Sequence, residues 1–142
     1  MRQINRIVIH STATYADMNV DADWVRQVHV NENGWADIGY HFVICRDGTV
    51  ELGRPIATPG AHVRGFNSDS IGIAMVGGLG EDDQAEDNFT DEQFKALANL
   101  ITTLDSVEQI AGSEVVGHNE LDSKKECPCF DLAAFMAENF DE

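Results

Sequence analysis

GHNELDSKKECPCFD, residues 117–131, gathers one histidine, two lysines and two cysteines in a single polar segment. His118 and Cys127 can turn back onto one metal ion, although a tetrahedral zinc site needs further ligands. His10 is the third candidate, because it ends the apolar run 4–9 as His118 ends the run 115–117. Two imidazoles at strand ends and one loop thiolate would leave the fourth zinc position to water. This pattern predicts a catalytic zinc site rather than a structural one.

Two other interpretations of these residues stay open. The histidines can be hydrogen-bonded core residues, with Cys127 a small buried apolar side chain, as free cysteine often is. Alternatively, Cys127 and Cys129 could both bind the metal, although one Cys-X-Cys pair lacks the spacing of ordinary structural zinc sites. The lysine beside the cysteine favours catalysis.

Length and composition limit the architecture and the compartment. The chain of 142 residues is about one domain long, so we expect a single domain over residues 1–142. No apolar run approaches the ~20 residues of a membrane span, so no membrane partner is expected. The first residues lack the apolar core of a secretory signal, which predicts a protein that is cytoplasmic at synthesis. Three cysteines, an odd number, fit a reduced compartment and one metal ligand.

The formal net charge of −16 is the most unusual bulk property. Only nine lysines and arginines are spread through the chain, whereas phosphate backbones require clustered basic residues. The charge therefore argues against nucleic acid as a partner, and a solvated acidic surface is its simplest interpretation.

Local patterns predict alternating strands and helices. Short β-branched or apolar runs predict strands, and the dipeptide Asp47-Gly48 predicts a hairpin turn between two of them. Capping residues followed by apolar side chains at helical spacing predict helices. The predicted strands are 5–10, the two runs flanking 47–48, 70–78 and 114–117, and the predicted helices begin near residues 21, 90 and 131. We therefore expect a mixed sheet covered by helices.

The loop 55–67 is rich in glycine and could form the wall of a cleft. His62 lies in it beside glycines that permit close backbone approach, which suits contact with a ligand. A plain surface position for His62 is the alternative.

Six motifs in order along the chain resemble those of the zinc-dependent N-acetylmuramoyl-L-alanine amidases, in particular the T-seven-type phage lysozymes. They are residues 9–14 (IHSTAT), 37–42 (DIGYHF), 46–50 (RDGTV), 60–65 (GAHVRG), 67–73 (NSDSIGI) and 127–131 (CPCFD). The resemblance implies a fold shared with peptidoglycan recognition proteins, which is an α/β domain with a mixed central sheet of about five to six strands and helices on both faces. It also implies hydrolysis of the amide bond between N-acetylmuramic acid and the L-alanine of the peptidoglycan stem peptide.

The resemblance also assigns roles to residues. The zinc ligands of the family fall on His10, His118 and Cys127, its catalytic tyrosine on Tyr40 and its catalytic lysine on Lys125. Lys124, the immediate neighbour of Lys125, is a competing choice for that lysine. We expect His62 and Asn67 at the rim of the site, where they would contact the glycan or the stem peptide.

Three biological roles are compatible with these motifs. The first is a monomeric phage endolysin that reaches the cell wall after release by a holin. The second is a peptidoglycan-binding module without catalysis, but such relatives typically lose the ligand that Cys127 supplies here. The third is a protein that regulates a phage RNA polymerase, a second role of the T-seven-type lysozyme.

Overall fold

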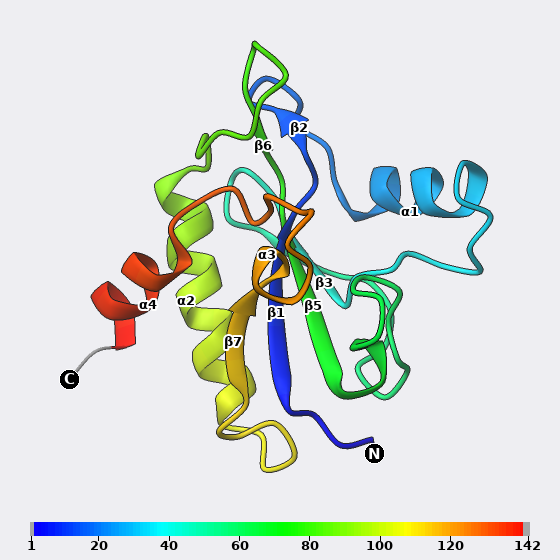
Figure 1. The fold of residues 1–142 in the computed structure, drawn as a ribbon, viewed down its shortest axis with the longest axis vertical. Helices are drawn as coiled ribbons and strands as arrows, with labels where there is room; N and C mark the ends of the chain where they lie inside the picture. The colour runs from blue at the N-terminus through cyan, green and yellow to red at the C-terminus, as the bar shows by residue number, and fades with distance from the viewer. Residues whose placement is uncertain (1, 141–142) are drawn as a thin grey trace.

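A mixed five-stranded sheet forms the centre of the molecule (Figure 1). The structure is a computed structural model, and it describes residues 2–140. The strand order is β4-β3-β5-β1-β7, in which β4 alone is antiparallel to its neighbour. The strands are β1 (Arg6–Ser11), β3 (Phe42–Ile44), β4 (Val50–Leu52), β5 (Ser70–Met75) and β7 (Glu114–Gly117). The predicted mixed sheet is confirmed.

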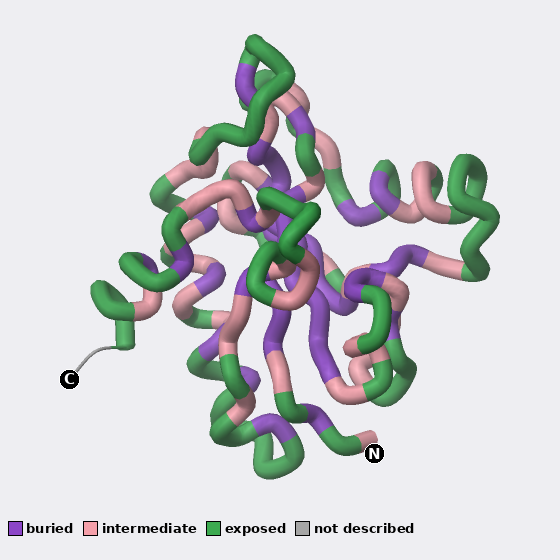
Figure 2. Tube along the Cα trace, in the orientation of Figure 1, coloured by how far each residue is buried: buried purple, intermediate pink, exposed green. Residues whose placement is uncertain are grey.

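The inner strands β1 and β5 are buried along most of their length because helices cover both faces of the sheet. Figure 2 shows them buried over most of their length. In the parallel register, Ile9 of β1 lies opposite Gly117 of β7. The residues that follow Ile9 and Gly117 are both histidines, so the register itself brings His10 and His118 side by side.

The predicted hairpin joins β3 to β4. Gly48 has a φ of 89°, which favours glycine, and the amide of Thr49 donates to the Asp47 carboxylate at 2.9 Å. The backbone angle and the hydrogen bond both depend on the Asp-Gly dipeptide, which is why this turn could be predicted from the sequence.

Helices pack on both faces of the sheet. Helices α2 (Asp91–Asp105) and α4 (Leu132–Phe140) pack against one buried cluster, which includes Ile44 of β3. Helix α1 (Ala22–Asn31) packs against a second cluster, which includes Val43. Neighbouring residues of a strand point to opposite faces, so the two clusters lie on opposite sides. Figure 1 shows α2 and α4 to the left of the sheet and α1 to the right.

The helix starts follow the predicted capping chemistry. The Asp21 side chain accepts from the backbone of Trp24, and Thr90 and Gln93 form a complete capping box at α2. The Asp131 carboxylate accepts from the amide of Ala134 at 3.0 Å at the start of α4.

Several short elements were not predicted. Strands β2 (Thr14–Tyr15) and β6 (Gly78–Leu79) pair in parallel as a separate two-stranded sheet, and a 3-10 turn, η1, spans Asn67–Asp69. The predicted strand 70–78 ends early, at Met75, because Gly77 has a φ of 133° and leaves the extended conformation. The remaining helix, α3 (His118–Leu121), begins at the candidate metal ligand.

Within residues 2–140, none of the helices has both the length and the apolar character needed to cross a membrane.

Candidate metal centre and active site

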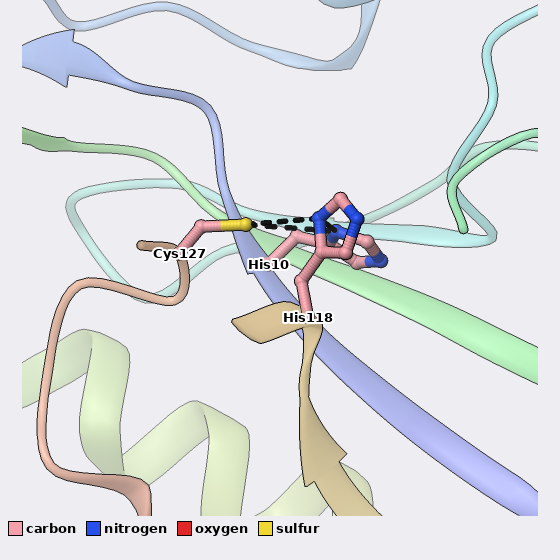
Figure 3. A group of neighbouring side chains, drawn as sticks. All are labelled: His10, His118 and Cys127. Carbon is pink, nitrogen blue, oxygen red and sulfur yellow. Dashed lines mark hydrogen bonds between the residues drawn. The ribbon is translucent and has the colours of Figure 1, made fainter. Parts of the chain in front are cut away.

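Three donor atoms from three separate segments converge near the C-terminal ends of β1 and β7 (Figure 3). We call His10, His118 and Cys127 the donor triad. The Nδ1 atoms of His10 and His118 lie 3.1 Å apart, and the Cys127 Sγ lies 3.1 Å from Nδ1 of His118 and 4.0 Å from Nδ1 of His10.

These distances fit a tetrahedral zinc ion. Zinc bonds of ~2.05 Å to nitrogen and ~2.3 Å to sulfur place two nitrogens about 3.4 Å apart and a nitrogen and a sulfur about 3.6 Å apart. Each observed separation lies within about half an ångström of these values. Imidazole and thiolate are also the ligands that zinc prefers, and three protein ligands leave a position for water.

Local hydrogen bonds explain why Cys127 faces the histidines. The backbone amide of Gly117 donates to the Glu120 carboxylate at 2.6 Å, which caps α3 at the position before His118. The amide of Asn119 donates to the carbonyl of Cys127 at 2.9 Å, which folds the loop back over the strand ends. A short helix and the loop after it therefore bring His118 and Cys127 together, although they are nine residues apart in the sequence.

The protonation states of the two histidines of the donor triad suit metal binding. Burial, with the neighbouring His62 and His118, holds the pKa of His10 well below its ordinary value. Burial also lowers the pKa of His118, and the charge of Lys125 acts in the same direction. Both imidazoles are therefore neutral, which is the form that binds metal.

The thiol of Cys127 behaves differently. Burial raises its pKa to about 11, while the Ser11 backbone amide and the charge of Lys125 act in the opposite direction. A divalent cation would compensate for the burial of the thiolate, so metal binding would release the proton of Cys127.

A cavity of about 420 Å³ opens beside the donor triad. We call it the triad cavity. His118, Cys127, Tyr40, Lys124 and Lys125 contribute to its walls. The Tyr40 ring centroid lies 5.1 Å from that of His10, and burial, followed by the nearby Cys127, raises the pKa of the phenol above its ordinary value. Tyr40 therefore stays protonated and can donate a hydrogen bond into the cavity.

The two adjacent lysines are not equivalent. Both are exposed and both line the triad cavity. The charge of Lys125 lowers the pKa of both His118 and Cys127, whereas Lys124 is not among the causes of either shift. Of the two lysines, Lys125 is therefore the one whose charge acts on the donor triad.

The predicted rim position of His62 is wrong. Its side chain is 7% exposed, and it lies behind His10 rather than at the mouth of the cavity. Its Nδ1 is 2.8 Å from Nε2 of His10, and its Nε2 is 3.2 Å from the Ser70 hydroxyl.

Asn67 is also occupied within the protein. Its side-chain oxygen accepts from the backbone amides of His62 and Val63, both at 2.9 Å. The glycine-rich loop brings His62 against the protein's own strand β5, at Ser70 and Gly72, and the sequence alone could not distinguish this from approach to a ligand.

Cys129 is not part of the donor triad. Its Sγ lies 3.3 Å from the Ser11 hydroxyl, and among the described residues the potential metal ligands that cluster are His10, His118 and Cys127. The interpretation with two cysteine ligands is therefore not supported.

One part of the wall of the triad cavity was not predicted from the sequence. It is formed by Gly78, Leu79, Asp83 and Ala85, in and after β6. A two-residue strand has no readable periodicity, and the acidic composition of this segment indicated only an exposed loop. Figure 2 shows that most of this segment is indeed exposed.

Three protein donors beside an open cavity are the arrangement of a catalytic zinc site. Fold and site together define a class: a single-domain α/β protein with a candidate hydrolytic metal centre at the ends of parallel strands.

Similarity to known proteins narrows this class. A family model described as N-acetylmuramoyl-L-alanine amidase matches residues 1–130. The endolysin of Klebsiella phage KP32 is 41% identical over 138 residues, which are 97% of this chain and 89% of the relative. The structure of the N-acetylmuramoyl-L-alanine amidase LysC from Clostridium intestinale has a TM-score of 0.78 at 28% identity, covering 96% of this chain and 85% of that one. Drosophila PGRP-LB has a TM-score of 0.81 at 25% identity, covering 99% and 84%.

The chain belongs to the N-acetylmuramoyl-L-alanine amidase family. It is an amidase, and this confirms the predicted family, fold and class of enzyme.

Proposed function

We propose that this chain hydrolyses the amide bond between the lactyl group of N-acetylmuramic acid and the L-alanine of the stem peptide, with zinc held by the donor triad. The convergence of the three donor atoms beside the triad cavity carries this proposal. The fit of the donor distances to zinc geometry supports the choice of metal.

The chemistry divides between the metal and the chain. Bound zinc would polarise a carbonyl group and lower the pKa of water from ~16 to ~7. Lys125 then places a positive charge where the carbonyl oxygen gains negative charge, which is the usual role of such a donor. The protonated phenol of Tyr40 can hydrogen-bond to the same oxygen or orient the attacking water.

We also propose that residues 1–142 act as one amidase domain. The family match ends at residue 130, but Leu132 and Phe135 of α4 are buried in the same cluster as β1 and α2. Because α4 completes this core, its removal would expose apolar surface of the sheet domain.

The biological role that we propose is that of a phage endolysin. The name of the Klebsiella phage relative supports it, together with the cover of nearly the whole length of that relative. In this role the protein is made as a monomer in the infected cell and reaches peptidoglycan after holin-type release.

Digestion of purified peptidoglycan tests the proposal. The released fragments are analysed by mass spectrometry, with untreated protein, chelator-treated protein and chelator-treated protein resupplied with zinc. We expect free stem peptides beginning with L-alanine, their loss after chelation and their return with zinc. Intact muropeptides in which only glycan bonds are cut, or full activity after removal of all metal, would contradict it.

A further inference from the structure

We propose that His62 is a positioning residue that holds the metal ligand His10 in its binding orientation through one hydrogen bond. This inference rests on the proposed zinc site. His10 has its two ring nitrogens in different surroundings. Its Nδ1 faces the other two donors, and its Nε2 faces Nδ1 of His62 at 2.8 Å. The two rings are nearly perpendicular, at 88°, with centroids 4.9 Å apart.

The direction of this hydrogen bond follows from metal ligation. If Nδ1 of His10 binds the metal, its hydrogen must be on Nε2, which then donates to Nδ1 of His62. His62 in turn carries its hydrogen on Nε2 and donates to the Ser70 hydroxyl, 3.2 Å away. Only one tautomer of each ring satisfies the whole chain of contacts. An acceptor behind a ligand histidine fixes its tautomer and the direction of its ring.

The surrounding backbone holds the ring of His62 in place. A Cβ on Gly72 of β5 would lie 2.6 Å from Cγ of His62, and a Cβ on Gly60 would lie 2.6 Å from its Cδ2. Both positions therefore require glycine while the ring is there. Because glycine inside a strand weakens the strand, Gly72 is best explained by this close approach.

Asn67 fixes the backbone of the same residue. Its side-chain oxygen accepts from the amides of His62 and Val63. Asn67 therefore holds the backbone of His62, and the side chain of His62 in turn holds the ring of His10. His62 is 7% exposed and His10 is 1% exposed, so water cannot readily replace the hydrogen bond between them.

The test measures zinc affinity of the full chain by competition with a chelator. The pair His62→Asn and His62→Leu is nearly isosteric. Asparagine keeps an acceptor, Oδ1, bonded to Cγ as Nδ1 is in histidine, whereas leucine has a methyl group there. We expect His62→Leu to bind zinc about 10- to 100-fold more weakly than wild type. We expect His62→Asn to stay within about threefold of wild type, since the acceptor remains.

A control separates positioning from general destabilisation. Gln93 is fully buried and donates to the carbonyls of Ile44 and Val76, away from the donor triad. Gln93→Leu should lower the free energy of unfolding and leave the zinc affinity of the folded protein unchanged. If His62→Leu does not fold, His62→Gln replaces it, because its acceptor is one bond farther from Cα and should also weaken zinc binding.

The zinc affinities of the variants decide whether His62 positions His10. Weak binding in His62→Leu or His62→Gln, with recovery in His62→Asn, supports the inference. Equal affinity in His62→Leu and wild type, equal losses in the leucine and asparagine variants, or an equal loss in Gln93→Leu would each overturn it. A wild-type protein that binds no zinc would instead overturn the proposed metal site, and this role of His62 with it.

Discussion

Replacing Lys125 by methionine removes one positive charge from the triad cavity and keeps an unbranched side chain of similar reach. Lys125 lines the cavity, and its charge acts on the pKa of both His118 and Cys127. Removing one group that stabilises a developing oxyanion typically costs about 100- to 1,000-fold in turnover. Because Lys125 is exposed, water screens its charge, and we expect a loss near the lower limit, about 100-fold.

Turnover is measured on a soluble muropeptide, with zinc content determined on the same samples. Lys124→Met is the matched control, since it changes the adjacent exposed lysine in the same way. We expect Lys124→Met to stay within about threefold of wild type and both variants to keep their zinc. Unchanged turnover in Lys125→Met, or equal losses in the two variants, would refute the assignment of Lys125.

Substitutions of Tyr40, His41 and Gln93 test the role of the phenol, the pH dependence of stability and the buried hydrogen bonds. Tyr40→Phe removes only the hydroxyl, so turnover should fall at least about tenfold while the melting temperature changes by less than about 3 °C; wild-type turnover would leave Tyr40 a packing residue. Burial lowers the pKa of His41 to about 4 from an ordinary 6.5, so the unfolded chain binds more protons between these values. His41 should therefore contribute up to about 3 kcal/mol to the fall in the free energy of unfolding of the metal-free protein as pH falls from 6.5 to 4, and the fall measured by urea denaturation should be smaller by about that amount in His41→Asn. Gln93→Leu removes one of two donors from each of the buried carbonyls of Ile44 and Val76 and should cost about 2 kcal/mol in the same assay; a loss below about 0.5 kcal/mol would contradict this role.

Features with a local chemical cause could be predicted from the sequence. The turn at Asp47-Gly48 and the capping box at Thr90 depend on residues within a few positions, and both are present. The pairing of β1 with β7 could not be derived locally, but His10 is the last residue but one of β1 and His118 directly follows β7. For that reason the candidate ligands His10 and His118 could be named without knowledge of the register.

Features that depend on distant contacts could not be predicted. His62 looked suited to a ligand because glycines surround it, yet Gly72 makes room for its ring inside the protein. In one continuous strand, alternation would put Tyr40 on the same face as Phe42, whereas Tyr40 packs with the cluster of Val43. The reason is that β3 begins only at Phe42, so the strand periodicity does not reach Tyr40.

The zinc content of purified, zinc-saturated protein after removal of free metal shows whether the donor triad binds one zinc ion. We expect one zinc ion per chain in the wild type and in Cys129→Ala, because Cys129 lies outside the donor triad. Cys127→Ala removes the single thiolate of the triad and should retain none. One zinc ion per chain in Cys127→Ala, or none in the wild type, would contradict a zinc site at the donor triad.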